Sequence, residues 1–441
     1  MVNCLIVGHG AREHVIGETL VRGGANLYSF MSFKNAGLED LSQGIKIHSE
    51  TDFKTIIEFA KNNKIDFAVI GPESPLVVGI VDALEKSGVP CVGPKIEAAQ
   101  LEGSKVFTRN LLENYKIQSN IKSKRFNSLE GLKEYIKEMG EENIVVKPDG
   151  LTGGKGVKVY GDHLFSEQDI IDYCEELIKQ GGIFLLEEKC DGEEFTLQTF
   201  VDGKNVVGSP LVQDHKRAYE DDKGPNTGGM GSYSIEDHLM PFITKNDVSN
   251  ALEDMKKVVA AVKAETGVEY KGFLYGQFMK TKQGLKLIEF NARMGDPEAM
   301  NVLPLLKTNF VDVCWAIING NLNGINIEFE KKATVCKYLA PEGYPVSPKK
   351  DKIVKINKNK LSEIGAKYYY ASVYRKDDGN IYTTTSRAMG ILGIAENLEQ
   401  AEKISEKGVE CIQGKLFHRK DVGTSKLLQK RIDHMNSILV K

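Results

Sequence analysis

Short apolar runs alternate with amphipathic segments along the first hundred residues. The runs at Val2–Val7, Leu27–Met31 and Phe67–Ile70 have the length and composition of buried strands. Helical patterns occur between and after these runs, at Arg12–Val21, Asp52–Asn62 and Val77–Lys86. A further short strand is expected at Cys91-Val92. Strands that alternate with helices predict a parallel sheet covered on both faces. Ligands of such sheets bind beyond the carboxyl ends of the strands, where this chain has the loops Gly8–Gly10, Lys34–Gly37 and Gly71–Pro75.

The middle of the chain predicts smaller units of mixed helix and strand. Ser104 is placed to cap a helix over Lys105–Tyr115, and the polar segment Ile117–Arg125 reads as a linker. Beyond it we expect a helix capped by Ser128 and ending at Gly140. The further elements expected are strands at Ile144–Lys147, Val157–Tyr160, Phe184–Glu188, Gly272–Met279 and Leu285–Phe290, a helix at Glu167–Lys179 and a strand pair at the Asp202-Gly203 turn.

After about residue 325 the pattern becomes mostly strands, with one helix near Leu398–Gly408. The fold class expected is therefore α/β and α+β in several domains. It comprises an N-terminal parallel-sheet domain, a central mixed region and a small, mostly-β C-terminal domain.

Composition narrows the function classes. Of the 441 residues, 41% are hydrophobic and 27% charged, which is typical of a globular protein. A net charge of −3 provides no general field for nucleic acid or a membrane surface. No apolar run approaches the ~20 residues of a membrane span, and the start of the chain does not read as a signal peptide. Seven scattered cysteines without a CxxC pair indicate reduced thiols and a cytoplasmic location.

Gly8-His9-Gly10 resembles the opening of a dinucleotide-binding turn. Glu13 stands where the third glycine of that fingerprint belongs, and no acid follows a second strand at the usual distance. Three interpretations stay open: a nicotinamide site, a plain strand-to-helix turn, and a contact with phosphate or ribose. The helix start near Arg12 offers backbone N–H groups to an anion.

A glycine-rich loop, Pro148–Gly156, follows the strand-end Lys147. Its glycines allow backbone N–H groups to approach phosphate oxygens closely. It is not a Walker A loop, because Asp149 occupies the position of the first glycine and Gly156 that of the Ser or Thr. The alternative is a flexible hairpin beside a solvated lysine.

Polar residues of one predicted strand share a face. Alternation along Leu287–Arg293 places Glu289, Asn291 and Arg293 together, with Asp296 shortly after. Hard oxygen ligands beside a guanidinium suit Mg²⁺ with a phosphate or carboxylate, and a solvated polar face is the alternative. The long polar stretch at residues 213–231 indicates a functional loop, with a mobile surface loop as its alternative.

Taken together, these segments resemble the ATP-grasp enzymes and, within them, the phosphoribosylamine–glycine ligase family. The resemblance spans almost the whole chain. Its most specific stretches occur in the family's order, at Gly8–His14, Gly71–Leu76, Leu101–Lys105, Asp149–Val157, Gln213–Arg217, Gly224–Gly231 and Glu289–Glu298. It implies an N-terminal substrate-binding domain over residues 1–103, an ATP-grasp domain over 104–324 with a mobile lid at about 123–190, and a C-terminal domain over 325–441.

The resemblance also implies which residues bind the nucleotide and the metal. Lys105 and Lys147 match lysines that hold the phosphates of ATP, with the loop glycines and lysine above them: Gly153, Gly154, Lys155 and Gly156. Glu187, Glu188 and Lys189 match the segment that pairs with adenine through backbone groups, and Glu194 matches the acid that takes the ribose hydroxyls. Glu289 and Asn291 match ligands of Mg²⁺ or Mn²⁺.

For the other substrates, the resemblance implies a second set of residues. Arg293, Lys147 and Asp296 are the catalytic candidates, with Arg293 facing the acyl phosphate. The candidate contacts for glycine and phosphoribosylamine are Gly10, Glu13, Asn35, Gly37, Glu73, Asp214, Lys216, Asn226, Gly229, Arg293 and Asp296. The chain departs from related patterns at Gln277, where many ATP-grasp enzymes carry a metal-binding carboxylate, and at Thr385–Ala388.

The activity implied is ATP-dependent ligation of glycine to 5-phosphoribosylamine through glycyl phosphate, in de novo purine biosynthesis. A transient contact with the enzyme that makes phosphoribosylamine is a further hypothesis, and neither nucleic acid nor a membrane is expected as a partner. The alternatives are an ATP-grasp ligase with a different acceptor, a nicotinamide-dependent dehydrogenase and a nucleotide sensor without turnover.

Overall fold

A five-stranded parallel sheet forms the N-terminal part of the computed structural model, which describes residues 1–151, 153 and 156–440. The strand order is β3-β2-β1-β4-β5, with every neighbouring pair parallel, as predicted. The strands are β1 (Asn3–Val7), β2 (Asn26–Met31), β3 (Ser42–Ile47), β4 (Phe67–Ile70) and β5 (Cys91–Val92). The helices are α1 (Ala11–Arg22), α2 (Ala36–Leu41), α3 (Phe53–Asn62), α4 (Glu73–Val77), α5 (Ile80–Lys86) and α6 (Ile96–Gly103).

The predicted helix Val77–Lys86 corresponds to α5, which begins only at Ile80. It starts after Gly79, whose φ of +94° belongs to the left-handed region that glycine enters without a steric penalty. The short helix α4 before it was not predicted, and its first residue, Glu73, lies near the carboxyl end of β4. The sequence interpretation had missed α2 and β3.

Two antiparallel sheets make up the central region. The lid sheet has the order β6-β9-β7-β8, and a second sheet has the order β11-β10-β16-β17. The lid strands are β6 (Ser123–Phe126), β7 (Ile144–Pro148), β8 (Lys158–Val159) and β9 (Phe184–Glu188), packed on α8 (Leu132–Met139) and α9 (Glu167–Lys179). The second sheet comprises β10 (Gly192–Asp202), β11 (Val206–Gly208), β16 (Lys271–Thr281) and β17 (Gly284–Asn291), with α7 (Lys105–Asn114) and α10 (Lys245–Thr266) beside it.

Three expectations for this region were wrong. Strand β6 lies within the predicted linker, and α8 begins after Gly131 rather than at Ser128. The 22-residue helix α10 was not predicted at all. It begins at a capping box formed by Thr244 and Asp247, and ends at Gly267 with a φ of +75°.

The C-terminal region holds a larger sheet of order β12-β15-β18-β23-β20 and a smaller one of order β21-β22-β19-β24. These strands are β12 (Gln213–Asp214), β15 (Gly231–Ser234), β18 (Ala333–Pro341), β19 (Ile353–Ile356), β20 (Lys367–Tyr370), β21 (Val373–Arg375), β22 (Ile381–Thr383), β23 (Met389–Ala395) and β24 (Ile412–Gln413), with β25 (Leu416–Phe417) on β18. Three helices rather than the predicted one accompany them: α13 (Lys358–Ile364), α14 (Leu398–Val409) and α15 (Ser425–Val440).

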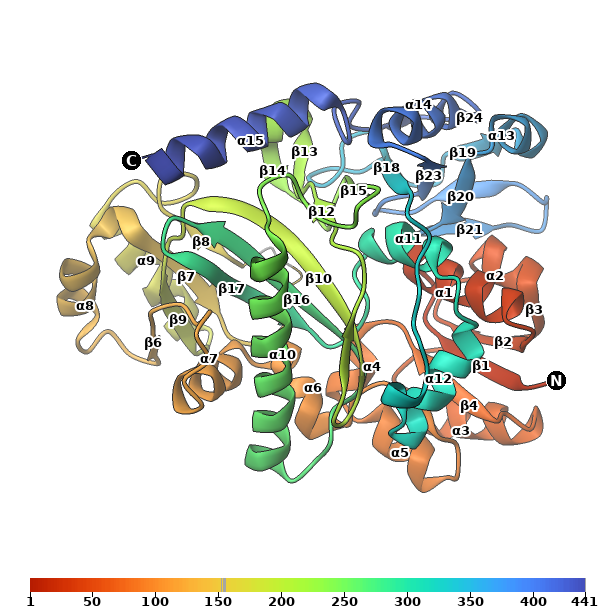
Figure 1. Ribbon diagram of the computed structural model, residues 1–441, viewed down its shortest axis with the longest axis horizontal. Helices are drawn as coiled ribbons and strands as arrows, with labels where there is room; N and C mark the ends of the chain where they lie inside the picture. The colour runs from red at the N-terminus through yellow and green to blue at the C-terminus, as the bar shows by residue number, and fades with distance from the viewer. Residues whose placement is uncertain (152, 154–155, 441) are drawn as a thin grey trace.

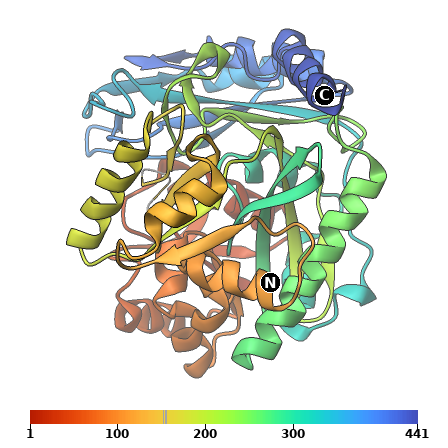
Figure 2. The same ribbon diagram turned by 90° about the vertical axis from the view of Figure 1, so that its left-hand side faces the viewer.

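Connecting elements complete the chain: β13 (Arg217–Tyr219), β14 (Lys223–Asn226), α11 (Glu298–Val302), α12 (Phe310–Asn319) and the 3₁₀ turns η1 (Glu141–Asn143), η2 (Glu220–Asp222), η3 (Leu303–Leu305) and η4 (Leu322–Gly324). In Figure 1 the lid lies on the left and the N-terminal sheet at the lower right, while α15 crosses the top. Figure 2 turns the lid helices toward the viewer. Among the described residues no helix is both long and apolar enough to cross a membrane.

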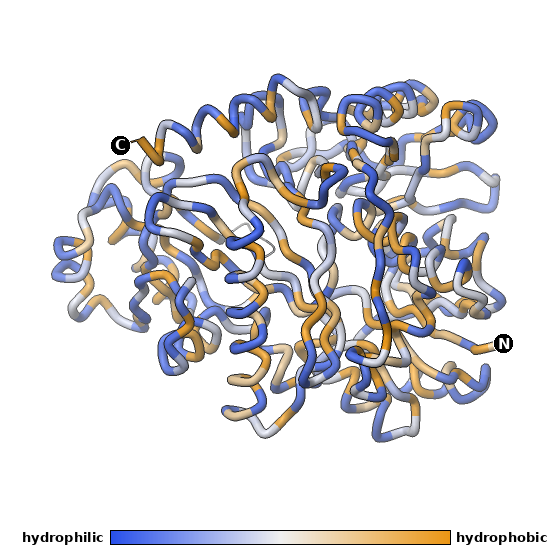
Figure 3. The backbone as a smooth tube through the Cα atoms, in the orientation of Figure 1, coloured by the Kyte–Doolittle hydropathy of each residue, from blue (hydrophilic) through white to orange (hydrophobic). Residues whose placement is uncertain are grey.

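One hydrophobic core joins the N-terminal sheet to the rest of the molecule. Side chains of α12 pack on this sheet, and Trp315 meets Phe67 edge to face at 5.1 Å between ring centroids. Apolar and polar residues alternate along α10 and α15 in Figure 3, as expected for helices that cover a core with one face. Gly272 of β16 also approaches Gly93, which follows β5, main chain against main chain.

We expect Gly272→Ala to destabilise the protein, because an added Cβ would lie 2.8 Å from Cα of Gly93 and φ at Gly272 is +127°. A main-chain neighbour cannot rotate away, so overpacking and backbone strain together should lower the free energy of unfolding by about 2–4 kcal/mol. Urea denaturation measures the loss. Gly284→Ala is the matched control, since its φ is +109° but no described atom lies within 4 Å of the added Cβ. Equal losses in both variants would show that the contact with Gly93 is not tight.

Candidate nucleotide and substrate site

A cleft of about 760 Å³ lies between the lid sheet and the β10-β16-β17 sheet. It extends to the N-terminal domain at Arg12 and to the C-terminal region at Arg387. Most residues proposed from sequence line it: Glu73, Lys105, Lys147, Gly153, Glu187, Glu188, Lys189, Glu194, Asp214, Lys216, Asn226, Glu289, Asn291, Arg293 and Asp296. Gly154 and Lys155 lie outside the described residues.

A buried ion cluster joins the two sheets at the centre of this cleft. Nζ of Lys147, near the end of β7, lies 2.8 Å from Oε2 of Glu187 on β9. Arg109 of α7 donates from Nε to Oε1 of the same carboxylate at 2.7 Å. Burial opposes ionisation of Glu187, but Arg109 and Lys147 outweigh it and lower its pKa to about 2. The carboxylate is therefore charged, and it holds Lys147 in place.

The carboxyl end of β17 presents a charged carboxylate and a neutral amide to the cleft. Burial disfavours ionisation of Glu289, but the cations of Lys216, Lys147 and Lys105 outweigh it and keep its pKa below the ordinary value. Asn291 lies two residues on and lines the same cleft. A carboxylate and an amide supply hard oxygens that suit a divalent cation. Among the described residues, no group of three His, Cys, Asp or Glu is placed to hold a metal ion.

Glu194 and Lys216 line the cleft across from this carboxyl end. Nε2 of Gln277 donates a hydrogen bond to Oε2 of Glu194, and Nζ of Lys216 lies 3.5 Å from the same oxygen. Nζ of Lys216 also donates to Oε1 of Gln277 at 2.7 Å. Gln277 thus positions a lysine and an acid at this wall of the cleft.

Arg293 connects the central region with the N-terminal domain. Its Nε lies 3.2 Å from Oε2 of Glu73 on α4, and its Nη2 lies 3.0 Å from Oε1 of Glu102 on α6. Burial opposes ionisation of Glu73, but Arg293 and Arg12 lower its pKa to about 2, whereas burial raises the pKa of Glu102 to about 7. The guanidinium is thus fixed by two acids and remains at the cleft wall.

Acids and an arginine from the C-terminal region surround the far end of the cleft. Burial and the charge of Glu298 raise the pKa of Asp214 well above its ordinary value. Arg387 lies 3.3 Å from Oδ2 of Asp296 and donates to the carbonyls of Gly228 and Gly229 at 2.6 and 2.8 Å. Gly229 does not itself line the cleft, but its φ of +103° and its contact with Asp214 leave no room for a side chain.

Glu13 fills the glycine-lined space at the end of β1. Its Oε2 accepts from the N–H of Gly10 at 2.6 Å, and its Oε1 accepts from Nε of Arg12 at 2.7 Å. A Cβ added at Gly8 or Gly71 would lie 2.5 or 2.2 Å from Glu13. A carboxylate therefore stands in the space that a dinucleotide would need for its pyrophosphate, which argues against the dehydrogenase alternative.

Asn35 and Gly37 are buried at the contact with the C-terminal region, away from the cleft lining. Oδ1 of Asn35 accepts from the N–H groups of Gly37 and Leu38, and its Nδ2 donates to the carbonyls of His9 and Tyr370. A Cβ at Gly37 would lie 2.0 Å from the ring of His14. These contacts account for both residue types, and the role of the two residues in substrate binding stays a prediction.

Near the lid, the structure describes contacts of two segments expected to bind the nucleotide: the segment Glu187–Lys189 and the glycine-rich loop. The N–H groups of Glu188 and Lys189 donate to the carbonyls of Lys122 and Asn143 at 2.9 and 2.8 Å, so these two donors are not free for adenine. The carbonyl of Gly156 accepts from the hydroxyl of Tyr173 at 2.7 Å, while Nζ of Lys105 donates to the carbonyl of Gly150. These contacts hold Gly150 and Gly156, two described residues of the glycine-rich segment.

Sequence reasoning missed several residues of the cleft. Arg109, Glu102 and Glu298 line it but stand outside the assigned set, and Arg431 reaches it from α15. Glu298 accepts hydrogen bonds from the hydroxyls of Tyr275 and Thr196 at 2.8 and 3.3 Å. The sequence signal that could have identified these cleft residues is a charged residue on an otherwise apolar helix face.

Two antiparallel sheets that enclose a lysine-lined cleft, with a charged carboxylate at a strand end, define the ATP-grasp class of enzymes. In agreement, residues 103–299 match the ATP-grasp (A) domain of phosphoribosylglycinamide synthetase. Residues 2–102 match the N domain and residues 334–425 the C domain of the same enzyme. The chain therefore belongs to the phosphoribosylglycinamide synthetase family, that is, the phosphoribosylamine–glycine ligases, which are ATP-grasp ligases of purine biosynthesis.

Full-length relatives and a solved structure agree with this family. The phosphoribosylamine–glycine ligase of Methanococcus vannielii is 49% identical over 442 residues, which cover 99% of each chain. That of Thermococcus gammatolerans is 50% identical and covers 98% of this chain and 97% of its own. The crystal structure of the Thermotoga maritima phosphoribosylamine–glycine ligase superimposes with a TM-score of 0.81 at 28% identity, covering 95% of this chain and 100% of that one.

We expect Glu187→Gln to lower the free energy of unfolding at pH 7 by about 3–5 kcal/mol, because it leaves two buried cations without their carboxylate. The pKa of Glu187 is about 2 in the folded protein, against an ordinary value of 4.5. Its stabilisation is therefore complete above pH 4.5 and is lost as the pH falls toward 2. Urea denaturation between pH 7 and 3 should show a smaller acid loss in the variant than in the wild type.

Glu188→Gln is the matched control, since Glu188 is the next residue but is partly exposed. It should change the free energy of unfolding by less than about 1 kcal/mol. A pH profile of Glu187→Gln parallel to that of the wild type would contradict a charged, buried Glu187.

Proposed function

We propose that this chain joins glycine to 5-phosphoribosylamine with ATP, giving glycinamide ribonucleotide, ADP and phosphate. The observation that carries the proposal is the convergence of Lys105, Lys147 and Lys216 on Glu289, next to an Arg293 that reaches into the N-terminal domain. Such a group of charges suits phosphoryl transfer to a carboxylate. The relatives' names supply the two substrates.

The chemistry follows from the poor reactivity of a carboxylate. Transfer of the γ-phosphoryl group to the carboxylate of glycine gives glycyl phosphate, and the amine of phosphoribosylamine then attacks the carbonyl carbon as phosphate leaves. Lys105 and Lys147 bind the phosphate oxygens, and the fork of Arg293 orients the acyl phosphate. Catalysis is therefore positioning and electrostatics, with no side-chain nucleophile.

Glu289 and Asn291 are the proposed ligands of a divalent cation, Mg²⁺ or Mn²⁺. When bound, the ion neutralises phosphate charge during the transfer. For the adenosine part, Glu194 would accept from the ribose hydroxyls, and the segment Glu187–Lys189 would border the base. With two N–H groups engaged, we expect base contacts from main-chain carbonyls and from Cys190, which also lines the cleft.

The remaining assignments of the sequence interpretation are also proposals. The N-terminal domain, residues 1–103, would bind phosphoribosylamine, with Gly10, Glu13 and Glu73 nearest the cleft. Asp214 and Asp296 would contact the ammonium group of glycine, whose positive charge would favour the ionised form of the buried Asp214. We further propose domain limits at 104–324 and 325–441, a cytoplasmic location and a transient contact with the enzyme that supplies phosphoribosylamine.

Substrate omission tests the activity. We expect ADP release, followed by a coupled assay, to require both glycine and phosphoribosylamine, because only the complete pair leads to turnover of the acyl phosphate. Alanine in place of glycine serves as the matched control. Equal ADP release with alanine or with another amine would instead indicate an ATP-grasp ligase with a different acceptor.

We expect Glu289→Gln to fold normally and to lose at least ~10²-fold in kcat, since a major electrostatic group disappears at nearly constant side-chain volume. Turnover at saturating ATP over a range of Mg²⁺ measures this loss, and Mg²⁺-dependent binding of ADP provides a second readout. Glu328→Gln, at an exposed carboxylate that pairs with Lys307, makes the same chemical change away from the cleft. Near-normal turnover of Glu289→Gln at high Mg²⁺ would refute the metal assignment.

A further inference from the structure

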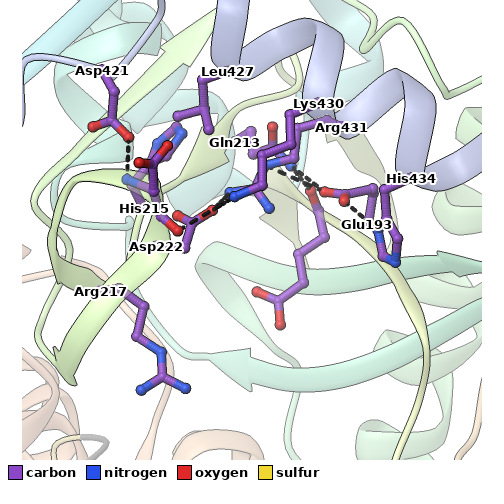
Figure 4. A network of polar contacts seen from close by, with 12 residues as sticks. Glu193, Gln213, His215, Arg217, Asp222, Asp421, Leu427, Lys430, Arg431 and His434 are labelled. Atoms are coloured by element: carbon purple, nitrogen blue, oxygen red, sulfur yellow. Dashed lines mark hydrogen bonds and ion pairs between the residues drawn. The ribbon is translucent and has the colours of Figure 1, made fainter.

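Helix α15 ends the chain and lies beyond residues 334–425, the part that matches the C domain of the family. It crosses from the C-terminal region toward the lid, over β10 (Figure 1). Leu427, Met435 and Ile438 are its buried apolar residues. Its Arg431 and His434 point instead at acids of the central region (Figure 4).

Arg431 contacts two carboxylates from different elements. Its Nη2 lies 2.6 Å from Oδ2 of Asp222, and its Nε lies 3.6 Å from Oε2 of Glu193. This Nε is buried and has no hydrogen-bond partner among the described residues. His434 lies one turn further along, with Nδ1 2.6 Å from Oε1 of Glu193. Helix α15 thus contacts both Asp222 and Glu193 through side chains on one of its faces.

Asp222 is at the turn of the hairpin formed by β13 and β14. Arg419 is fully buried, lies 3.0 Å from Oδ1 of Asp222 and donates to the carbonyl of Arg217 at 3.2 Å. Two guanidinium groups from the C-terminal segment therefore hold this one carboxylate. The flanks of the hairpin carry Lys216 and Asn226, both of which line the nucleotide cleft. The side chain of Arg217 reaches Asp162 of the lid.

Glu193 precedes Glu194 on β10, so the two side chains point to opposite faces of the sheet. Both acids border the cleft, but Glu193 contacts Arg431 and His434 of α15, whereas Glu194 contacts Gln277 and Lys216. Nε2 of Gln213 donates to the carbonyl of Glu194 at 2.9 Å and lies 3.4 Å from Oε2 of Glu193. A shift of Glu193 would therefore move the main chain that presents Glu194 to the cleft.

The charges of this network compensate one another. Burial raises the pKa of Glu193, and the charge of Arg431 and a hydrogen bond with His434 oppose that rise. Burial, Arg419 and Arg431 lower the pKa of His215 to about 3, so this histidine is neutral and does not compete for Asp222. Loss of Arg431 would leave Glu193 with His434, and Asp222 with Arg419 and the more distant Lys430.

We propose that Arg431 is a positioning residue for the nucleotide site. By pairing with Asp222 and Glu193 it holds the β13–β14 hairpin and β10 so that Lys216 and Glu194 face the nucleotide. Arg431 borders the cleft, but its guanidinium group is engaged by these two carboxylates, so it acts through them. The inference rests on the proposed nucleotide site and adds a residue from outside the matched family domains.

Calorimetric titration with MgADP tests the role directly, without turnover. We expect Arg431→Gln to weaken binding about tenfold, the effect of one lost buried charge pair near a site. Arg431→Lys should restore part of the affinity, because it keeps the charge but not the fork. Lys426→Met removes one positive charge from an exposed position of the same helix and should bind like the wild type.

Steady-state kinetics separates positioning from general damage. We expect KM for ATP to rise with the loss of MgADP affinity, while kcat and KM for glycine stay within about threefold. Equal rises in both KM values, or unchanged MgADP binding in Arg431→Gln, would overturn the role of Arg431. A wild-type protein that binds no MgADP would overturn the proposed nucleotide site as well.

If Arg431→Gln prevents folding, the double variant Asp222→Asn/Arg431→Gln keeps the proposal testable. It removes the acid together with its cation, so no uncompensated carboxylate remains at Asp222. We expect it to fold and still to bind MgADP about tenfold more weakly, because the hairpin has lost its anchor. Affinity equal to that of the wild type in the folded double variant would overturn the proposal.

Discussion

A β-bulge at Ile288 is the constraint on which the cleft depends. In β17, Glu289 pairs with Gln277 and Leu287 with Phe278, so Ile288 is the extra residue. The carbonyl of Ile288 accepts from Nη2 of Arg109 at 2.9 Å and from Nζ of Lys147 at 3.2 Å. The same two cations hold Glu187 of the lid sheet. The bulge thus reverses which side chains face the cleft, and its freed carbonyl joins the two sheets.

Acids make the excess of positive charge around Glu289 tolerable, because they pair with three of its cations. Lys147 has Glu187, Lys216 has Glu194, and Arg293 has both Glu73 and Glu102. Isolated buried cations would shift their pKa values and lose charge, whereas paired cations remain charged. A site prepared in this way meets a polyanion with little reorganisation, which is how preorganised electrostatics lowers a barrier to phosphoryl transfer.

The sequence predicts those features that depend on neighbouring residues. Helix α9 has its predicted bounds, and Glu289 and Asn291 share a face as strand alternation requires. The bulge itself was not predictable, since strict alternation would group Leu287 with Glu289, and both Leu287 and Phe290 are buried. Sequence analysis also did not identify Arg109 and Arg431, because their partners are 78 and 209 residues away in the chain and neither arginine belongs to a local motif.

Parts of the chain that are distant in sequence therefore share one cleft. Glu73 comes from α4 of the N-terminal domain, Arg293 from the segment just after β17, and Arg387 from the C-terminal region, where it contacts Asp296. An acyl phosphate hydrolyses in water, so a site that forms it must exclude solvent from all sides. The N-terminal, central and C-terminal regions all line the cleft. They can exclude solvent only if they stay in fixed positions relative to one another. The shared hydrophobic core of α12 and the N-terminal sheet, and the ion pairs of α15, supply that rigidity at opposite ends of the cleft.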